Sequence, residues 1–395
     1  MKTIIYFFFF ILFSLNQCVD ASESEYKIIG YYPNWAIYRN PTLKPSGLDP
    51  NLVTHINYAF AKVDTAGNII LFDSWADTDY RSDWNTEKPY WGNFRELYDL
   101  KKKYPHLKTL ISIGGWTLSD TFSQMAESPD ARKNFAKKAV EFCKKYDFDG
   151  IDIDWEYPCF TEHQGRPQDK INFTLLLAEL HAAAKSASPK LLVTIAAPAG
   201  SGNYNNMEVS KIHRYLDWIN LMTYDMHGPW PDSENNITNH QSALYPAKKG
   251  NPELSIESVV RFYLSQGVPP EKLVLGMPLY GRTFANAKAT STGLFSSYQG
   301  AGTGTTSEVG MRFFYDIKQN LSLTHHLHWD EIAQVPYLHN SQTGEFITFD
   351  NETSLQIKCE WLKKMNLGGA MVWELGLDTR PSWDAMKAIN GVLKN

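Results

Sequence analysis

Short apolar runs recur along the chain, and each is followed by a polar or amphipathic stretch. The runs are rich in Val, Ile, Leu and aromatic residues, a composition typical of β-strands that are buried on both faces. This pattern predicts eight strands. They lie at residues 28–32, 55–61, 109–114, 150–155, 192–197, 218–223, 273–277 and 370–374.

Many stretches between these strands repeat apolar residues every three or four positions, which is the pattern of a helix with one buried face. Repeated alternation of strand and helix in a chain of 395 residues predicts an α/β protein, a (β/α)8 TIM barrel. A doubly wound open sheet is the competing fold, but no GxGxxG motif follows the first strand. Helices are predicted at 94–103, 129–146, 169–186, 256–266, 354–365 and 383–393.

One long stretch, residues 283–350, breaks the alternation. It is rich in Gly, Ser, Thr and Tyr and contains a strand-like piece at 344–349. Loops of this length inside a domain seldom lack structure of their own. We therefore expect a small α+β subdomain at 283–350, inserted after the seventh strand into a catalytic barrel made of residues 22–282 and 351–395.

The first residues have the pattern of a secretory signal peptide. Lys2 precedes an apolar run at 4–15, and small residues end at Ala21. The run is shorter than the ~20 residues that span a bilayer. We predict a signal peptide at 1–21 and a secreted, extracellular protein without a membrane partner. Glycosylation sequons begin at Asn172, Asn236, Asn320 and Asn351, and the sequence leaves their occupancy open.

Charge and cysteine usage exclude several classes of function. A net charge of −5 offers no basic surface for nucleic acid. Residues 22–395 contain an odd number of cysteines, Cys143, Cys159 and Cys359, which argues against a disulfide scaffold and leaves a single bridge open. His325 and His326 lack partner ligands at a spacing that suits zinc. We expect no metal, no cofactor and a monomer.

The fourth predicted strand carries the candidate chemistry. Asp152, Asp154 and Glu156 alternate with apolar residues, so their side chains share one face, directed toward the barrel axis. Glu156 comes last, at the carboxyl end of the strand, where active sites of such barrels lie. Because clustered carboxylates cannot all ionise cheaply in a partly dry site, one should stay protonated near neutral pH. A protonated carboxyl is what a general acid requires.

Two other interpretations of these acids compete with the catalytic one. A solvated acidic strand face is disfavoured because unpaired charges that point into a barrel cost several kcal/mol. A site for a divalent cation needs further oxygen ligands from neighbouring loops, and this strand alone does not supply them.

Residues 149–156, DGIDIDWE, resemble the DxxDxDxE motif of the family 18 glycoside hydrolases, the chitinases and their relatives. Three further segments, each on or just after a predicted strand, are similar to motifs of that family. They are Ser112 to Trp116 (SxGG), whose glycines we interpret as barrel packing, Met222 to Asp225 (MxYD) and Tyr280 to Arg282 (YxR).

The resemblance implies a chitinase that cuts β-1,4 bonds between N-acetylglucosamine units and retains the anomeric configuration. The nucleophile is then the substrate's own 2-acetamido oxygen. Glu156 is the implied general acid and base, and Asp154 hydrogen-bonds the acetamido N–H. Asp152 shares a proton with Asp154. Tyr224 donates to the acetamido oxygen, and Asp225 contacts the distorted sugar.

The resemblance also implies a surface for chitin or chitooligosaccharides. Trp373, on the eighth strand, matches the Trp beneath the reacting sugar, and other aromatic rings extend the platform along the polymer. Met222 is expected to pack below the sugar. The expected substrate-binding residues are Trp35, Phe60, Trp116, Met222, Trp230, Tyr280, Arg282 and Trp373.

Two alternative functions use the same barrel. A chitin-binding lectin that has lost catalysis predicts a residue other than an acid at position 156, where this chain has Glu. An endo-β-N-acetylglucosaminidase that cuts N-glycans uses the same acid and acetamido chemistry. An aromatic surface beside an inserted subdomain suits a long linear polymer better than a branched glycan.

Overall fold

The computed structural model describes residues 26–81, 88–230, 236–306, 309–321 and 323–394. The predicted signal peptide lies outside these ranges. Within them, no helix is both long and apolar enough to cross a membrane.

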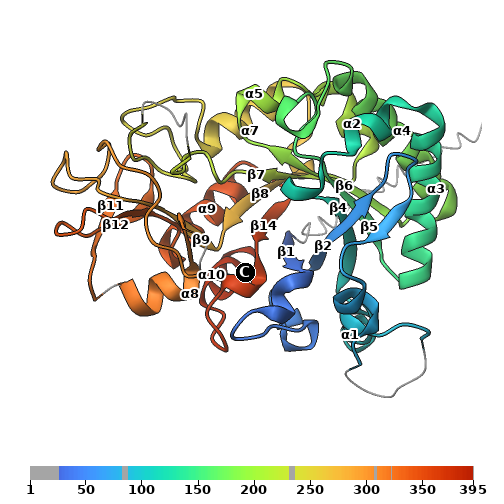
Figure 1. Cartoon of the computed structure of the whole chain (residues 1–395), viewed down its shortest axis with the longest axis horizontal. Coiled ribbons are helices and arrows are strands. Elements are labelled where there is room, and N and C mark those ends of the chain that lie inside the picture. The colour runs from blue at the N-terminus through green and yellow to red at the C-terminus, as the bar shows by residue number, and fades with distance from the viewer. Residues whose placement is uncertain (1–25, 82–87, 231–235, 307–308, 322, 395) are drawn as a thin grey trace, which may run out of the picture.

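Eight parallel strands form a closed barrel at the centre of the molecule (Figure 1). The first strand pairs with the last as well as with the second, and this double pairing closes the sheet. The predicted (β/α)8 barrel is therefore confirmed. The barrel strands are β1 (Lys27–Pro33), β2 (His55–Val63), β4 (Lys108–Gly114), β5 (Gly150–Asp154), β6 (Leu192–Pro198), β7 (Trp218–Met222), β8 (Leu273–Pro278) and β14 (Gly369–Trp373), and β3 (Ile69–Leu71) extends β2 at its edge.

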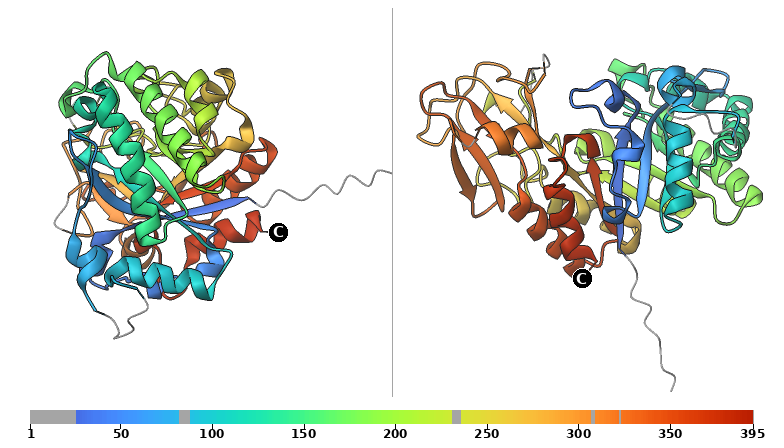
Figure 2. Two further views of the ribbon diagram at one scale, coloured as in Figure 1. Left: turned by 90° about the vertical axis from the view of Figure 1, so that its right-hand side faces the viewer. Right: turned by 90° about the horizontal axis from the view of Figure 1, so that it is seen from below.

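Helices surround this barrel (Figure 2). Their ends follow local chemistry: Ser128 caps α3 by accepting a hydrogen bond from the backbone N–H of Ala131, and Asp147 ends it in the left-handed conformation. The helices are α1 (Gly92–Lys103), α2 (Phe122–Glu127), α3 (Pro129–Tyr146), α4 (Asp169–Ala187), α5 (Ser201–Tyr204), α6 (Val209–Ile212), α7 (Ile256–Ser265), α8 (Phe314–Asp316), α9 (Glu352–Lys364) and α10 (Asp384–Leu393).

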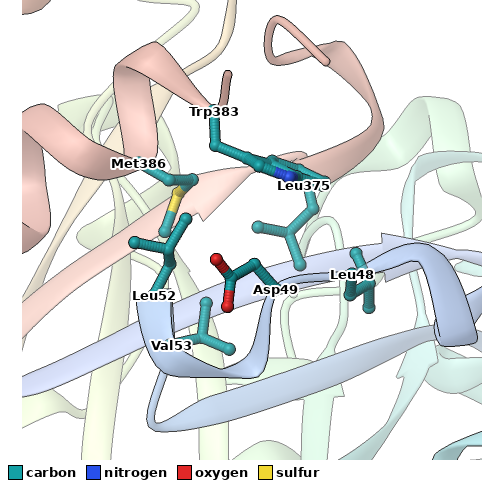
Figure 3. Close-up of a pocket in the computed structure, with 7 residues that line it drawn as sticks. All are labelled: Leu48, Asp49, Leu52, Val53, Leu375, Trp383 and Met386. Atoms are coloured by element: carbon teal, nitrogen blue, oxygen red, sulfur yellow. The ribbon is translucent and has the colours of Figure 1, made fainter. Parts of the chain in front are cut away.

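The C-terminal helix α10 packs on the loop between β1 and β2 (Figure 3). Side chains from both segments, with Leu375 from the turn before α10, meet around a cavity of only about 10 Å³, enough for about one water molecule. These contacts hold helix α10 against the loop between β1 and β2. The residues are Leu48, Asp49, Leu52, Val53, Leu375, Trp383 and Met386.

A second, antiparallel sheet follows β8 and lies beside the barrel (Figure 1). It begins with β9, which pairs with both β10 and β13. An insertion with its own sheet thus follows the seventh barrel strand, as the fold prediction states. The strands are β9 (Tyr280–Phe284), β10 (Met311–Phe313), β11 (His326–Asp330), β12 (Val335–His339) and β13 (Phe346–Thr348).

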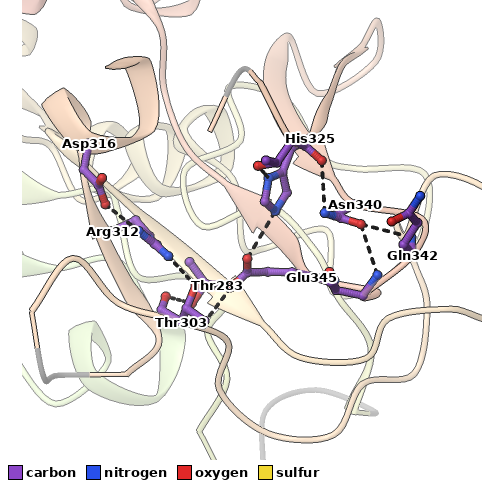
Figure 4. A network of polar contacts seen from close by, with 10 residues as sticks. Thr283, Thr303, Arg312, Asp316, His325, Asn340, Gln342 and Glu345 are labelled. Atoms are coloured by element: carbon purple, nitrogen blue, oxygen red, sulfur yellow. Dashed lines mark hydrogen bonds and ion pairs between the residues drawn. The ribbon is translucent and has the colours of Figure 1, made fainter. Parts of the chain in front are cut away.

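Polar contacts tie this second sheet to its loops (Figure 4). Glu345 accepts hydrogen bonds from the His325 ring (3.1 Å) and from the backbone N–H of Thr303 (2.7 Å). The Thr303 carbonyl accepts a bond from the Thr283 hydroxyl (2.8 Å). Because Thr283 lies on β9, the network fixes the strand that also carries Arg282.

Candidate active site

The register of the barrel places polar side chains around Asp152. Its neighbours across β4 and β6 are Ser112 and Thr194. Their hydroxyls donate to the Asp152 carboxylate at 2.7 and 2.6 Å. Tyr31 of β1 donates at 2.7 Å and the Asn220 amide of β7 at 3.1 Å. Four donors from four strands therefore hold this carboxyl inside the barrel.

The alternation predicted for β5 is confirmed by the other face of the strand. Trp155 is buried outside the barrel, where its ring stacks on Phe122 with centroids 5.4 Å apart and meets Phe173 edge-on. The two aspartates are buried on the opposite side. Trp155 is therefore a core residue, and the carboxyl groups are directed inward.

Burial raises the pKa of both aspartates. For Asp152 the four donors oppose this rise. The pKa of Asp154 lies well above its ordinary value, first because of burial and then because of the nearby charges of Glu156 and Asp152. One carboxyl oxygen of Asp154, Oδ1, is buried and accepts no hydrogen bond from any described residue. Asp154 can thus accept a bond from a donor that the protein does not supply.

Glu156 lies just beyond the end of β5 and is half-buried. Burial raises its pKa to about 7, and the charge of Asp225 also acts in this direction. Hydrogen bonds from the Tyr157 hydroxyl and the Trp116 backbone N–H act against the rise. A carboxyl group with this pKa exchanges its proton near neutral pH.

Two glycines bring the third and fourth strands together at this point. Gly114 has φ +117°, and a side chain there would meet the Asp154 carbonyl oxygen at 2.1 Å. Gly115 donates its backbone N–H to the same oxygen at 2.7 Å. The glycines of the SxGG segment therefore serve close backbone packing beside the acids, as interpreted from the sequence.

The segment after β7 brings Tyr224 and Asp225 to the same end of the barrel. Arg282 of β9 donates two hydrogen bonds to the Asp225 carboxylate, both 2.7 Å long. The Tyr224 ring is buried and meets the Tyr280 ring at 6.3 Å, and its hydroxyl lies 3.9 Å from the sulfur of Met371. The ion pair thus joins the barrel to the second sheet at the site.

Aromatic rings gather around Trp373 at the end of β14. Its ring stacks on Phe60 with centroids 5.7 Å apart and is 6.4 Å from Trp35. Tyr31, the donor to Asp152, lies 5.4 Å away. A single aromatic cluster therefore extends from the buried aspartate to the half-buried face of Trp373.

The remaining predicted residues lie around this centre. Met222, the last residue of β7, is buried. Trp230 is 38% exposed and its ring lies 5.4 Å from the Arg282 guanidinium. Trp116 is 49% exposed and contacts the loop that follows Glu156. Arg282 and Tyr280 are thus engaged with Asp225 and with other rings, so their roles toward a sugar stay predictions.

Several residues that support the acids were not predicted from the sequence. Tyr31, Thr194 and Asn220 are polar residues at inward positions of otherwise apolar strands, and that signal was present in the sequence. The Tyr157 hydroxyl acts to lower the pKa of Glu156, but an aromatic residue next to an acid carries no comparable signal.

Within the described ranges, no group of three or more His, Cys, Asp or Glu side chains is arranged to hold a metal ion. Cys143, Cys159 and Cys359 are free thiols. The buried Asp152 carboxylate is surrounded by hydroxyl and amide donors.

Comparisons with known proteins point to one family. Residues 27–378 match the model of the glycosyl hydrolases family 18. Chitinase A1 of Niallia circulans is 38% identical over 93% of this chain, which spans only 58% of that protein's length. Chitinase 1 of Aphanocladium album is 38% identical over 92% of this chain and 84% of its own length.

Solved structures agree with this match. The Group IV chitinase of Ostrinia furnacalis, solved in complex with allosamidin, has a TM-score of 0.85 at 31% identity, over 93% of this chain and 99% of that chain. Human YKL-39 is described as a pseudo-chitinase with retained chitooligosaccharide binding. Its structure has a TM-score of 0.83 at 29% identity, over 94% of this chain and 100% of that chain. The chain belongs to the glycosyl hydrolases family 18.

Proposed function

We propose that this protein is a secreted chitinase that hydrolyses β-1,4 bonds between N-acetylglucosamine units and retains the anomeric configuration. The observation that carries the proposal is the series of carboxyl groups on β5 and just beyond it. Glu156, with a pKa raised to about 7, can hold a proton near neutral pH, as a general acid must. The similarity to chitinases supports the substrate.

In the proposed reaction, Glu156 donates its proton to the glycosidic oxygen as the bond from that oxygen to C1 breaks. The carbonyl oxygen of the substrate's 2-acetamido group attacks C1 and forms an oxazolinium ion, so no protein atom acts as nucleophile. The Glu156 carboxylate then takes a proton from water, which attacks C1 and opens the ring. Two displacements at C1 leave the product in the β configuration.

Asp154 orients the nucleophile in this scheme. Its buried Oδ1, which no described residue donates to, accepts the acetamido N–H and stabilises the positive charge of the ring. Asp152 shares a proton with Asp154 from a position fixed by four donors. Tyr224 donates its hydroxyl to the acetamido oxygen, and Trp373 offers an apolar face to the sugar.

Hydrolysis of N-acetylglucosamine hexamer tests this proposal. We expect turnover by the wild type and a loss of at least about 100-fold in kcat for Glu156→Gln, because the amide cannot donate an acidic proton. Glu162→Gln, the same change at an exposed carboxylate in the following loop, is the matched control and should act like the wild type. Equal turnover by Glu156→Gln and the wild type contradicts the proposed role.

A non-catalytic binding protein is the second candidate, because the fold is shared with a described pseudo-chitinase. The same experiment separates the two functions. A folded wild type that binds the hexamer but produces no shorter products over a long incubation is a lectin and not a chitinase.

Secretion is proposed from residues 1–21 alone, since a positive start, an apolar run and small residues at the end form a cleavable signal. Expression of the full chain in a secreting host should release protein into the medium with Ser22 as its first residue. Intact mass measurement of that protein checks the cleavage, and retention of the full chain in the cells contradicts it.

A further inference from the structure

The peptide groups of Glu156 are held from two sides. Its backbone N–H donates to the hydroxyl oxygen of buried Ser119 at 2.8 Å. Its backbone carbonyl lies 2.6 Å from the Nδ1 atom of His163, in the short helical turn Thr161–His163. The Ser119 hydroxyl hydrogen is directed at the Gly115 carbonyl, 2.9 Å away. Among the described contacts, the donor to the Glu156 carbonyl is His163.

The chemistry of the contact identifies the donor atom of His163. A carbonyl oxygen only accepts hydrogen bonds, so the Nδ1 atom of His163 carries a proton and donates it to the Glu156 carbonyl. The same ring lies edge-on to Trp116, with centroids 4.4 Å apart at 62°. The Trp116 backbone N–H also acts to lower the pKa of Glu156. His163 therefore contacts both the Glu156 carbonyl and the Trp116 ring.

We propose that His163 is a positioning residue of the active site. This inference rests on the proposed function. The Nδ1–H group fixes the carbonyl of Glu156 and so the direction of its acid side chain, while the ring fixes the indole of Trp116, which is half-exposed and expected to contact sugar. The two actions belong to different atoms of one side chain, so they are separable by substitution.

Two variants of His163 separate its hydrogen bond to Glu156 from its ring contact with Trp116. His163→Asn keeps an N–H donor near the position of Nδ1 but removes the ring. His163→Phe keeps a ring against Trp116 but removes the donor. His181→Phe is the matched control. His181 lies on the outer helix α4, and its Nδ1 atom makes the same kind of contact, 2.8 Å from the Tyr215 carbonyl oxygen. Both sites are half-exposed, and thermal melts verify the folding of all three variants.

Kinetics and binding with N-acetylglucosamine hexamer are the readouts. We expect His163→Phe to lower kcat about tenfold with KM nearly unchanged, since one hydrogen bond that orients the acid is lost. We expect His163→Asn to keep kcat within about threefold but to raise KM and Kd by a similar factor, because the indole is less ordered. In a Trp116→Ala background, this second effect should disappear.

The inference is overturned if both variants change kcat and KM alike, or if neither differs from His181→Phe. A wild type without turnover is a different result, because it removes the proposed function. Hexamer Kd values still test the ring contact in that case: equal Kd for the wild type and His163→Asn contradicts it.

Discussion

At the scale of single residues, the burial of the three carboxyl groups decreases along β5 and just beyond its end. Asp152 is fully enclosed and has four donors, Asp154 is buried with one oxygen that no described residue donates to, and Glu156 is half-buried. Each carboxyl has a raised pKa for a different balance of reasons. The group with access to solvent is also the one whose pKa, about 7, suits proton transfer.

The raised pKa of Glu156 predicts the basic limb of the pH profile. An acid catalyst must be protonated, so kcat/KM should be constant below about pH 7 and fall about tenfold per pH unit above it. A profile of kcat/KM from pH 4 to 9 measures this limb. A fall centred near pH 4.5, the ordinary value for Glu, contradicts the role of burial.

The donors to Asp152 predict a kinetic effect of Tyr31→Phe. The change removes one hydrogen bond to the carboxylate but keeps the ring 5.4 Å from Trp373. We expect kcat to fall about tenfold and KM to stay within about twofold. Tyr263→Phe, which removes a buried hydroxyl bonded to the Pro198 carbonyl, is the control. A rise in KM without a fall in kcat contradicts the role of Tyr31.

At the scale of elements, the barrel was predictable and its insertion only partly so. Strands such as β6 and helices such as α3 follow local periodicity, and their bounds agree with the prediction to within two residues. The strand β10 (Met311–Phe313) is three residues long and pairs with Arg282 and its neighbours on β9. Such short strands carry no periodicity, and their pairing depends on distant partners.

The same distinction applies to the site. The acids of β5 were predictable because the alternation of one strand fixes their face. The ion pair of Asp225 with Arg282 was not, because it joins the loop after β7 to the second sheet. A sequence motif indicates that both residues matter, but the contact between them follows from the packing of two elements.

One buried ion pair predicts the stability of helix α9. Lys358 lies 2.6 Å from Asp350, and neither side chain is exposed. Lys358→Met should lower the free energy of unfolding by about 3–5 kcal/mol, because it leaves the Asp350 charge unpaired. Urea unfolding measures this loss. The double variant Lys358→Met/Asp350→Leu should recover most of it, and equal loss in both variants contradicts the account.

An exposed ion pair on helix α7 is the control for this effect. Arg261 and Glu257 on α7 are paired at 2.8 Å, but the Arg261 side chain is 66% exposed. Arg261→Met should cost less than about 1 kcal/mol, because water solvates both charges when the pair is broken.

At the scale of the whole molecule, two sheets meet at one site. The closed barrel supplies the acids and Trp373, and β9 of the second sheet supplies Arg282 and Tyr280. The polar network around Glu345 holds β9 to its own loops (Figure 4). The site therefore depends on the relative position of barrel and insertion as well as on the acids themselves.

The anomeric form of the first product tests the central claim most directly. Proton NMR can follow N-acetylglucosamine hexamer during cleavage by the wild type, before mutarotation equilibrates the new reducing ends. The proposed attack by the acetamido group, followed by water, predicts that these ends form in the β configuration. Initial formation of the α anomer requires a single displacement by water, and it would contradict the mechanism proposed for Glu156 and Asp154.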